Sequence, residues 1–377
     1  MKILLHISRI FVGVLFIFSG LIKANDPIGF SYKLEEYFFI FNLDFLASIA
    51  LIQAEFICLL EILLGIFLLI GYKINKTAWI LLLLIIFFTF LTGFSAITGK
   101  VTDCGCFGDA IPLTPTQSFL KDLILLGFII IIFKYRNEIK PLINKEKTNF
   151  YIAASSSFLI VFFMIYVTNH LPVKDFRPYK IGNNIREGMI IPEGAPEDSV
   201  VFTYICKNKT TGETKSFINQ YPADYDNWEF IEREDDIVKK GFEPPIHDFK
   251  LTDEDGKDYT EDVINNPNFS FLVISYDIKH FKPSNIGALK ELFVACDSNQ
   301  LKIYGLTSSP YIEIDNFRHE HGIGLPFYYA DATALKTIIR ANPGILLLKD
   351  GTILDKWHGN DIPTWKEIEA DYLNRKE

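Results

Sequence analysis

Residues 77–97 read Thr77-Ala-Trp-Ile-Leu-Leu-Leu-Leu-Ile-Ile-Phe-Phe-Thr-Phe-Leu-Thr-Gly-Phe-Ser-Ala-Ile97, an apolar stretch without a charged side chain. A helix of about 20 apolar residues spans the hydrocarbon core of a bilayer, which is about 30 Å thick. Four more stretches meet or nearly meet that length: Ile3–Ile22, Phe45–Ile70, Ser118–Phe133 and Phe150–Thr168. The sequence therefore predicts an integral membrane protein with a helical first half.

The first apolar stretch has a second interpretation, as a cleaved signal peptide. Its apolar run continues to Ile22 without an Ala-x-Ala-like site, and His6 and Arg9 interrupt its start. We therefore expect a retained first span. From residue 171 onward the chain is polar and acidic, which predicts a water-soluble second half. The net charge of −9 gives no indication of nucleic-acid binding.

The basic residues predict how the spans are oriented, because short cytoplasmic loops are enriched in Lys and Arg. The loop between the fourth and fifth stretches is the most basic: Lys134, Arg136, Lys140, Lys145 and Lys147. Placing it inside puts Lys2, Lys73 and Lys76 on the same side. The amino terminus is then cytoplasmic, and the soluble half lies outside. For a bacterial inner membrane, outside means the periplasm, an oxidising compartment.

The loop before the fourth stretch contains the chemically richest motif, Asp103-Cys-Gly-Cys-Phe-Gly-Asp109. Cys104 and Cys106 can close a disulfide across a very short loop, and Gly105 permits the backbone distortion that this requires. Gly108 is a second candidate structural glycine. A strained disulfide is more easily reduced than a structural one. The motif therefore predicts a redox pair on the outer face.

The flanking residues leave other interpretations of this motif open. Asp103 and Asp109 oppose thiolate formation, whereas Lys100 and the following helix start favour it. That start is predicted at Thr114-Pro-Thr-Gln117, with Thr at the cap and Pro at the first helical position. The cysteines are alternatively a structural turn, or a thiolate metal site. A metal is the least favoured alternative, because a closed tetrahedral site needs four ligands.

The second apolar stretch carries polar groups that are costly inside a bilayer. Glu55, Cys58 and Glu61 fall within an arc of about 120° on one helix face. We interpret Glu55 and Glu61 as candidate proton-handling groups for thiol oxidation, with Lys23 and Arg9 as candidate partners. The alternative is that they only fix helix packing. Cys58 is expected to be a core residue.

The first half resembles the DoxX/MauE family of small membrane proteins. The resemblance rests on Ser19-Gly-x-x-Lys-x-x-Asp-Pro27, on the four-span layout and on the motif around Cys104 and Cys106. It implies a four-helix domain at residues 1–140. The fifth apolar stretch predicts a further transmembrane helix at 141–170, outside the resemblance. The resemblance also implies a membrane role in thiol redox or in the maturation of redox proteins.

Residues 171–240 are predicted to form a small β-containing connection. Val200–Asn208 and Thr214–Ile218 alternate around a turn, as the strands of a hairpin do. Cys206 lies on the first of these strands and is expected to be a core residue or a free thiol. The last domain is then residues 241–377.

The order of elements in this last domain is similar to thioredoxin-like proteins of the peroxiredoxin and thiol-reductase type. Pro343 stands where that fold has its cis-proline, which makes it a candidate cis bond. The predicted elements are a strand at Phe269–Tyr276, a helix at Pro283–Ser298, a strand at Leu301–Thr307, a helix at Ala332–Ile339, strands at Gly344–Lys349 and Thr352–His358, and a helix from Thr364.

This domain departs from its relatives at the usual active site. The loop after the first central strand normally carries Cys-x-x-Cys, but Tyr276–Pro283 contains no cysteine. The domain therefore cannot run a dithiol cycle at that place. Cys296 is expected to be buried. The histidines His280, His319 and His321 are expected on a solvated surface rather than in a metal site.

Three hypotheses follow for the whole chain. The first is a membrane thiol-redox protein that exchanges through Cys104 and Cys106 with a periplasmic client or redox partner, which the thioredoxin-like domain recognises. The second is a membrane-anchored binding or assembly factor whose cysteine loop is structural. The third is an accessory subunit of a quinone-linked respiratory complex. Apart from a possible quinone, the sequence gives no evidence of a cofactor or metal.

Overall fold

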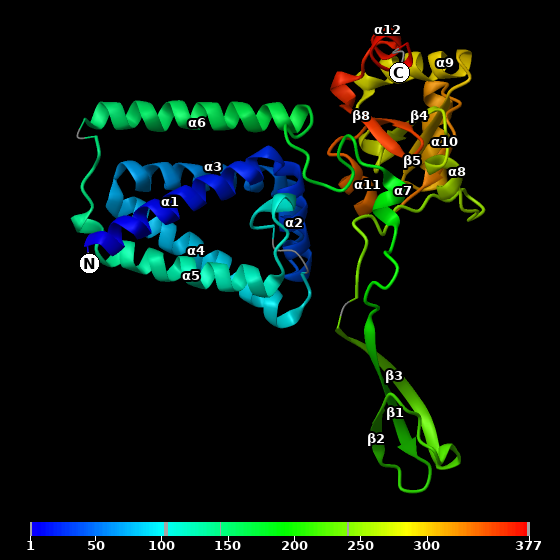
Figure 1. Cartoon of the computed structure of the whole chain (residues 1–377), viewed down its shortest axis with the longest axis horizontal. Helices are drawn as coiled ribbons and strands as arrows, with labels where there is room; N and C mark the ends of the chain where they lie inside the picture. Colours follow the sequence, from blue (N-terminus) through cyan, green and yellow to red (C-terminus); the bar gives the residue numbers. More distant parts are fainter. Residues whose placement is uncertain (1, 102–104, 144, 240, 375–377) are drawn as a thin grey trace.

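The computed structural model describes residues 2–101, 105–143, 145–239 and 241–374. Within these residues, five helices are long and apolar enough to cross a membrane (Figure 1). They are α1 (Lys2–Asn25), α3 (Ala50–Ile70), α4 (Ile74–Thr98), α5 (Pro115–Lys134) and α6 (Glu146–Asn169). All five predicted helices are confirmed; four have slightly longer bounds, whereas α3 begins at Ala50 rather than Phe45.

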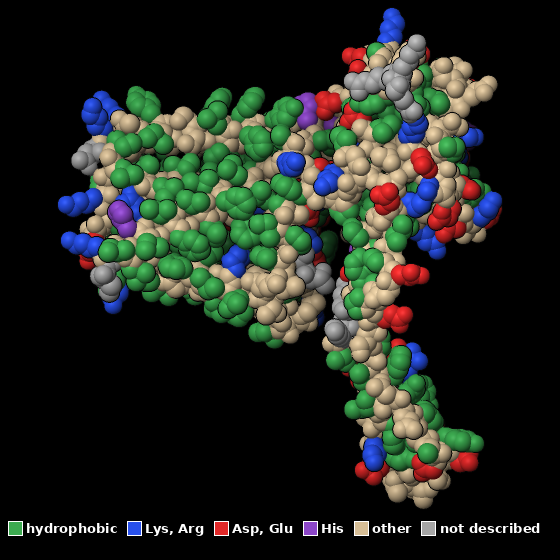
Figure 2. All heavy atoms as spheres, in the orientation of Figure 1, with side chains coloured by type: hydrophobic (Ala, Val, Ile, Leu, Met, Phe, Trp, Pro, Cys, Tyr) green, Lys and Arg blue, Asp and Glu red, His purple; other side chains and the backbone are tan. Residues whose placement is uncertain are grey.

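The surface of this helical part is apolar, as Figure 2 shows. Phe56, Phe90, Phe158 and Phe162 are all exposed there. So large an apolar surface would be costly in water and is what a lipid-facing surface requires. Together with the span lengths, it identifies a multi-pass membrane protein.

Two local signals position the loops at one end of the bundle. α2 (Pro27–Ile40) begins with Pro27, and the Asp26 carboxylate caps it by accepting a hydrogen bond from the Gly29 amide at 2.8 Å. α5 begins with the expected capping box, in which Thr114 and Gln117 each bond the other's backbone amide. These caps fix where the chain leaves α1 and where it enters α5.

A three-stranded antiparallel sheet projects from the soluble half (Figure 1). Its strands are β1 (Ser199–Asn208), β2 (Thr214–Ile218) and β3 (Trp228–Lys239), in the order β2-β1-β3. We call residues 199–239 the arm. The hairpin prediction is confirmed, and β3 is an addition. Its run of charged residues from Glu232 to Asp236 hides the alternation that marks a strand.

The last domain is built on a five-stranded sheet in the order β6-β5-β4-β7-β8. The strands are β4 (Phe269–Ile274), β5 (Lys302–Thr307), β6 (Phe327–Tyr329), β7 (Gly344–Lys349) and β8 (Thr352–His358). β4, β5 and β6 are parallel, and β7 and β8 are antiparallel to their neighbours. The Asn342–Pro343 bond is cis. This arrangement confirms the thioredoxin-like fold.

Helices cover both faces of this sheet, because its strands are buried on both sides. They are α7 (Ile185–Met189), α8 (Thr260–Ile264), α9 (Ile286–Ser298), α10 (Tyr311–His321), α11 (Ala332–Ile338) and α12 (Trp365–Ile368). Phe271 and Leu347 face the α9, α10 and α12 side, whereas Leu272 and Leu346 face the α8 and α11 side.

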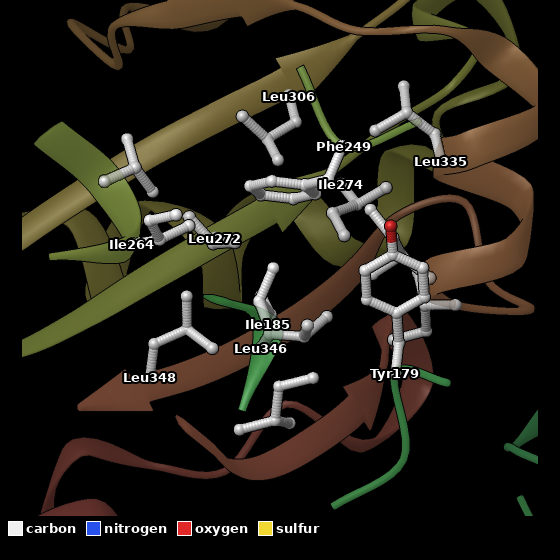
Figure 3. Packing of buried hydrophobic residues seen from close by; sticks show 14 of the residues in the cluster. Tyr179, Ile185, Phe249, Ile264, Leu272, Ile274, Leu306, Leu335, Leu346 and Leu348 are labelled. Carbon is white, nitrogen blue, oxygen red and sulfur yellow. The ribbon is translucent and has the colours of Figure 1, made fainter. Parts of the chain in front are cut away.

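The chain just after α6 belongs to this core. Tyr179 and Ile185 lie among the buried residues of the sheet, close to Leu346 (Figure 3). Asn184 also forms a β-bridge with Thr352. The region predicted as one connection, residues 171–240, is therefore divided in the structure. Its first part packs on the thioredoxin-like domain, and the arm follows as an insertion.

Candidate functional site

The cysteine loop lies between α4 and α5, at the end of the bundle that faces the thioredoxin-like domain (Figure 1). Cys104 lies outside the described residues. Cys106 is half-buried, and its carbonyl oxygen lies 3.0 Å from the Ser19 hydroxyl of α1. Gly105 and Gly108 have φ angles of +64° and +49°. Glycine adopts these left-handed angles without strain, which agrees with a structural role for both.

Directly below this loop lies a buried ion pair between Lys23 of α1 and Glu61 of α3, each only 3% exposed. The Ser19 hydroxyl lies 3.1 Å from Glu61 Oε2, so it stands between this pair and the Cys106 backbone. The Lys23 ammonium also lies about 5 Å from the ring centres of Phe30 and Phe88. Of the two candidate partners for Glu61, the structure selects Lys23.

A second buried charge reaches the same place from α5. Asp122 accepts hydrogen bonds from Thr92 Oγ1 at 3.0 Å and from Lys121 Nζ at 2.6 Å. Lys121 also lies over the ring of Phe107, with 5.2 Å from its Nζ to the ring centre. Lys121 and Asp122 were not predicted as site residues. The signal that could have identified them is a charged pair near the start of an apolar span.

These groups line one cavity, which we call the bundle cavity. Its polar wall comprises Ser19, Lys23, Glu61, Thr92, Cys106, Lys121 and Asp122, and its aromatic wall comprises Phe16, Phe30, Tyr37 and Phe88. Lys121 is close enough to Cys106 and Glu61 for electrostatic interaction with both. A thiolate on Cys106 would therefore be stabilised by an adjacent ammonium group. The same cavity is lined by the buried acids and bases Glu61, Asp122 and Lys23.

The other predicted groups lie away from this cavity. Glu55 is half-buried and lies 3.4 Å from the Thr168 hydroxyl of α6. Arg9 donates hydrogen bonds to the carbonyls of Leu68 and Leu69 at the carboxyl end of α3. Cys58 is fully buried in the helical core, as expected.

The cysteines and histidines of the soluble half form no second site among the residues described. Cys206 and Cys296 are both fully buried. Burial raises the pKa of the Cys296 thiol to about 12, which disfavours its thiolate. His280 and His319 are exposed and pair with nearby aspartates. No group of three or more His, Cys, Asp or Glu side chains arranged to hold a metal ion occurs in the described part of the chain.

The two sequence motifs of the membrane half thus meet at one place, with Ser19 and Lys23 from the first beside Cys106 from the second. The same segment matches one family model, that of the methylamine utilisation protein MauE, over residues 1–135. We call this segment the MauE-like domain, after the family model that it matches. The resemblance inferred from the motifs is thereby confirmed for the membrane half.

Comparisons with individual proteins cover smaller shares. Protein TlpB of Flavobacterium psychrophilum is 30% identical over 152 residues, which represent 38% of this chain and 39% of the relative. The chain thus matches well under half of that relative's length. A putative protein disulfide isomerase from Bacteroides thetaiotaomicron aligns with 33% of this chain and with 80% of its own chain, at 17% identity and a TM-score of 0.24. The bacterioferritin comigratory protein of Xanthomonas campestris aligns with 33% of this chain and 87% of its own chain, at 14% identity and a TM-score of 0.24.

Proposed function

We propose that this membrane protein exchanges disulfides with a client on the outer face through Cys104 and Cys106. The observation that supports this most directly is the position of Cys106. It borders the bundle cavity, where Lys121 favours a thiolate and the Lys23–Glu61 pair can take up or release a proton. The proposal needs the outer face to be the periplasm, where disulfides persist.

The reaction has two balanced steps. The Cys104–Cys106 disulfide first accepts two electrons and two protons from a client dithiol, which becomes a disulfide. The reduced pair must then pass two electrons and two protons to an acceptor. We propose a membrane quinone, which becomes a quinol. Aromatic walls beside buried Lys and carboxylate groups suit an apolar ring with carbonyl oxygens.

The thioredoxin-like domain takes a supporting part in this proposal. Without a cysteine between Tyr276 and Pro283 it cannot exchange disulfides at the usual place. It and its arm would act as a non-catalytic module that recognises the client.

The first test is the redox state of the pair in living cells, measured by acid quenching and a thiol-alkylation gel shift. Wild type is compared with a Cys104→Ala, Cys106→Ala double variant, before and after a pulse of mild reductant. We expect a partly oxidised pair that recovers after the pulse. A pair fixed in one state throughout would refute thiol exchange and favour a membrane-anchored binding or assembly factor.

The second test addresses the acceptor. The purified full chain in detergent is reduced, freed of reductant and mixed with menadione without oxygen. We expect the cysteine pair to be oxidised as menadione is reduced, and the double variant to reduce none. A pair that reacts with oxidised glutathione but not with menadione would exclude the quinone and leave the exchange intact.

A further inference from the structure

The thioredoxin-like domain turns its usual client-facing surface towards the MauE-like domain. In this fold, the loop after the first central strand and the cis-proline loop flank the place where a cysteine pair would meet its client. Here Tyr276 begins the first of these loops, and Arg340 lies just before the cis bond at Pro343. Both residues contact the MauE-like domain.

Arg340 joins the two motifs of the membrane half. Its Nε lies 2.8 Å from Asp26 Oδ2, and its Nη2 lies 3.3 Å from Asp109 Oδ2. Asp26 belongs to the motif that begins at Ser19, and Asp109 ends the cysteine motif. One guanidinium group therefore bridges both carboxylates, as its planar fork of donors allows.

The bridge is buried and closely packed. The Arg340 side chain is only 8% exposed. Burial raises the pKa of Asp26, but Arg340 and then Arg177 lower it by more, so this pKa is below its ordinary value. Gly29 leaves room for the bridge, since a Cβ atom there would lie 2.7 Å from Arg340 Nη2. A buried arginine without its carboxylates would be strongly unfavourable, so this contact specifies one docked position.

Aromatic contacts surround the bridge. The Tyr32 hydroxyl of α2 donates to the Tyr276 hydroxyl at 3.4 Å. Lys336 of α11 places its ammonium 4.4 Å from the ring centre of Tyr32. The Arg340 guanidinium lies 5.5 Å from the same ring centre. The surface on α2 is thus matched to this one face of the thioredoxin-like domain.

The face is also held rigid from behind. Asn342 accepts a hydrogen bond from Ser275 Oγ at 3.0 Å and donates to the Asp277 carbonyl at 2.7 Å, which ties the cis-proline loop to the loop after β4. Arg177, in the segment that follows α6, donates to the Thr337 carbonyl of α11 at 3.0 Å. This bond ties the segment after α6 to the end of α11, next to Arg340.

We propose that this face has the chain's own cysteine loop as its partner, and that Arg340 is a positioning residue for the redox pair. Docked, Arg340 holds Asp109 and with it the loop in which Cys106 lies. Arg340 also lines a second cavity, whose wall shares Lys23 and Gly105 with the bundle cavity. The inference rests on the proposed function only in its consequence for the thiols, because docking itself does not require a redox cycle. A client then reaches the pair beside the docked face rather than on it.

The test uses the full chain in nanodiscs, with p-benzoylphenylalanine in place of Tyr32 to cross-link the docked domain. Arg340→Ala is compared with Arg340→Lys, and with Arg186→Ala as the matched control, since Arg186 pairs with Asp350 inside the thioredoxin-like domain. We expect Arg340→Ala to lower the cross-link yield at least about fivefold and to raise the alkylation rate of Cys106 by about 3- to 10-fold. Arg340→Lys should recover part of both, and the control should change neither.

The other possible results each test a different part of the proposal. An unchanged cross-link yield in Arg340→Ala refutes docking through this residue. A lost cross-link with unchanged Cys106 alkylation refutes the positioning role and leaves a simple attachment. Asp109→Asn, which removes one carboxylate without altering the soluble domain, should reproduce the change in alkylation. A pair that never cycles in cells would sink the proposed function while leaving the cross-link result unaffected.

Discussion

Glu55 and Glu61 occupy one face of α3, yet their surroundings differ. Glu61 is buried, paired with Lys23 and linked through Ser19 to the cysteine loop. Glu55 is half-buried at the contact with α6 and lies 3.4 Å from Thr168. If one of the two carboxylates handles protons for a thiol, the geometry favours Glu61.

We predict that Glu61→Gln slows the reoxidation of the reduced cysteine pair by at least about 10-fold, because proton transfer by a positioned group is worth about 10²- to 10⁴-fold. The matched control is Glu55→Gln, which removes a carboxylate from the same helix away from the cavity. Reoxidation by menadione is followed by stopped flow. Equal rates in the two variants would show that Glu61 only fixes helix packing.

His358 in the thioredoxin-like domain predicts a pH dependence of stability. Burial, and then Lys282, lower the pKa of its imidazole to about 4. Its Nδ1 accepts a hydrogen bond from the Asn360 amide at 3.0 Å, which requires the neutral ring. The unfolded chain, with a histidine pKa of about 6.5, binds more protons between these values. Stability from this residue is therefore present above pH 6.5 and is lost as the pH falls towards 4.

We expect His358→Gln to remove up to about 3 kcal/mol of this acid sensitivity, since one pKa unit corresponds to about 1.4 kcal/mol. Thermal melting of the full chain at several pH values provides the measurement. His319→Gln is the control, because His319 is 82% exposed. Parallel pH curves for wild type and His358→Gln would assign the acid sensitivity to other groups.

At the residue scale, the sequence predicts a site better where a motif is contiguous. Cys106 and Glu61 were selected as candidates because a cysteine pair and an intramembrane carboxylate are conspicuous by themselves. Arg340 was missed, because nothing near position 340 indicates that its partners lie at Asp26 and Asp109. Such contacts depend on how two domains dock, which local spacing does not encode.

At the scale of elements, the arm is joined to its domain at one narrow base. The amide of Gly241 donates to the Asp198 side chain at 2.6 Å, so the two ends of the arm lie side by side. Among the described residues, no arm side chain belongs to the buried core of the five-stranded sheet. The arm therefore adds surface rather than stability, and part of that surface is apolar, as at Phe230 and Ile231.

We predict that replacing residues 199–239 with a short Gly-Ser linker changes the unfolding free energy of the thioredoxin-like domain by less than about 1 kcal/mol. Exchange of the cysteine pair with glutathione should also be unchanged, whereas exchange with a trapped client should fall. Melting curves and client mixed-disulfide yields test this. A shortened chain that still traps its client normally would remove the arm from the recognition module.

The observed helices and strands show which kinds of element a sequence predicts well. Long apolar helices and the buried strands β4 and β7 were correctly predicted, because their periodicity or composition is unambiguous. α10 and β6 were missed. α10 is polar, and β6 contains only 3 residues, so neither has a strong pattern of its own. Both are fixed by packing against the rest of the sheet.

For the whole molecule, charge distribution and chain path agree. Basic side chains gather at the end of the bundle that lies away from the thioredoxin-like domain (Figure 2). The amino terminus lies at that end (Figure 1). Five spans then bring the chain out at the opposite end, where α6 leads into the soluble half. Because basic residues are enriched in cytoplasmic loops, this distribution predicts that the thioredoxin-like domain and Cys106 lie on the outer side of the membrane.

This orientation predicts the behaviour of reporter fusions. Alkaline phosphatase, which needs disulfides to be active, should be active when fused after residue 377 and inactive when fused after residue 140, where the fourth span has returned the chain to the cytoplasm. Green fluorescent protein at the same two positions should give the reverse pattern and serves as the control. An inverted result would place Cys104 and Cys106 in a reducing compartment. Disulfide formation in a periplasmic client would then be impossible, whatever the geometry of the bundle cavity.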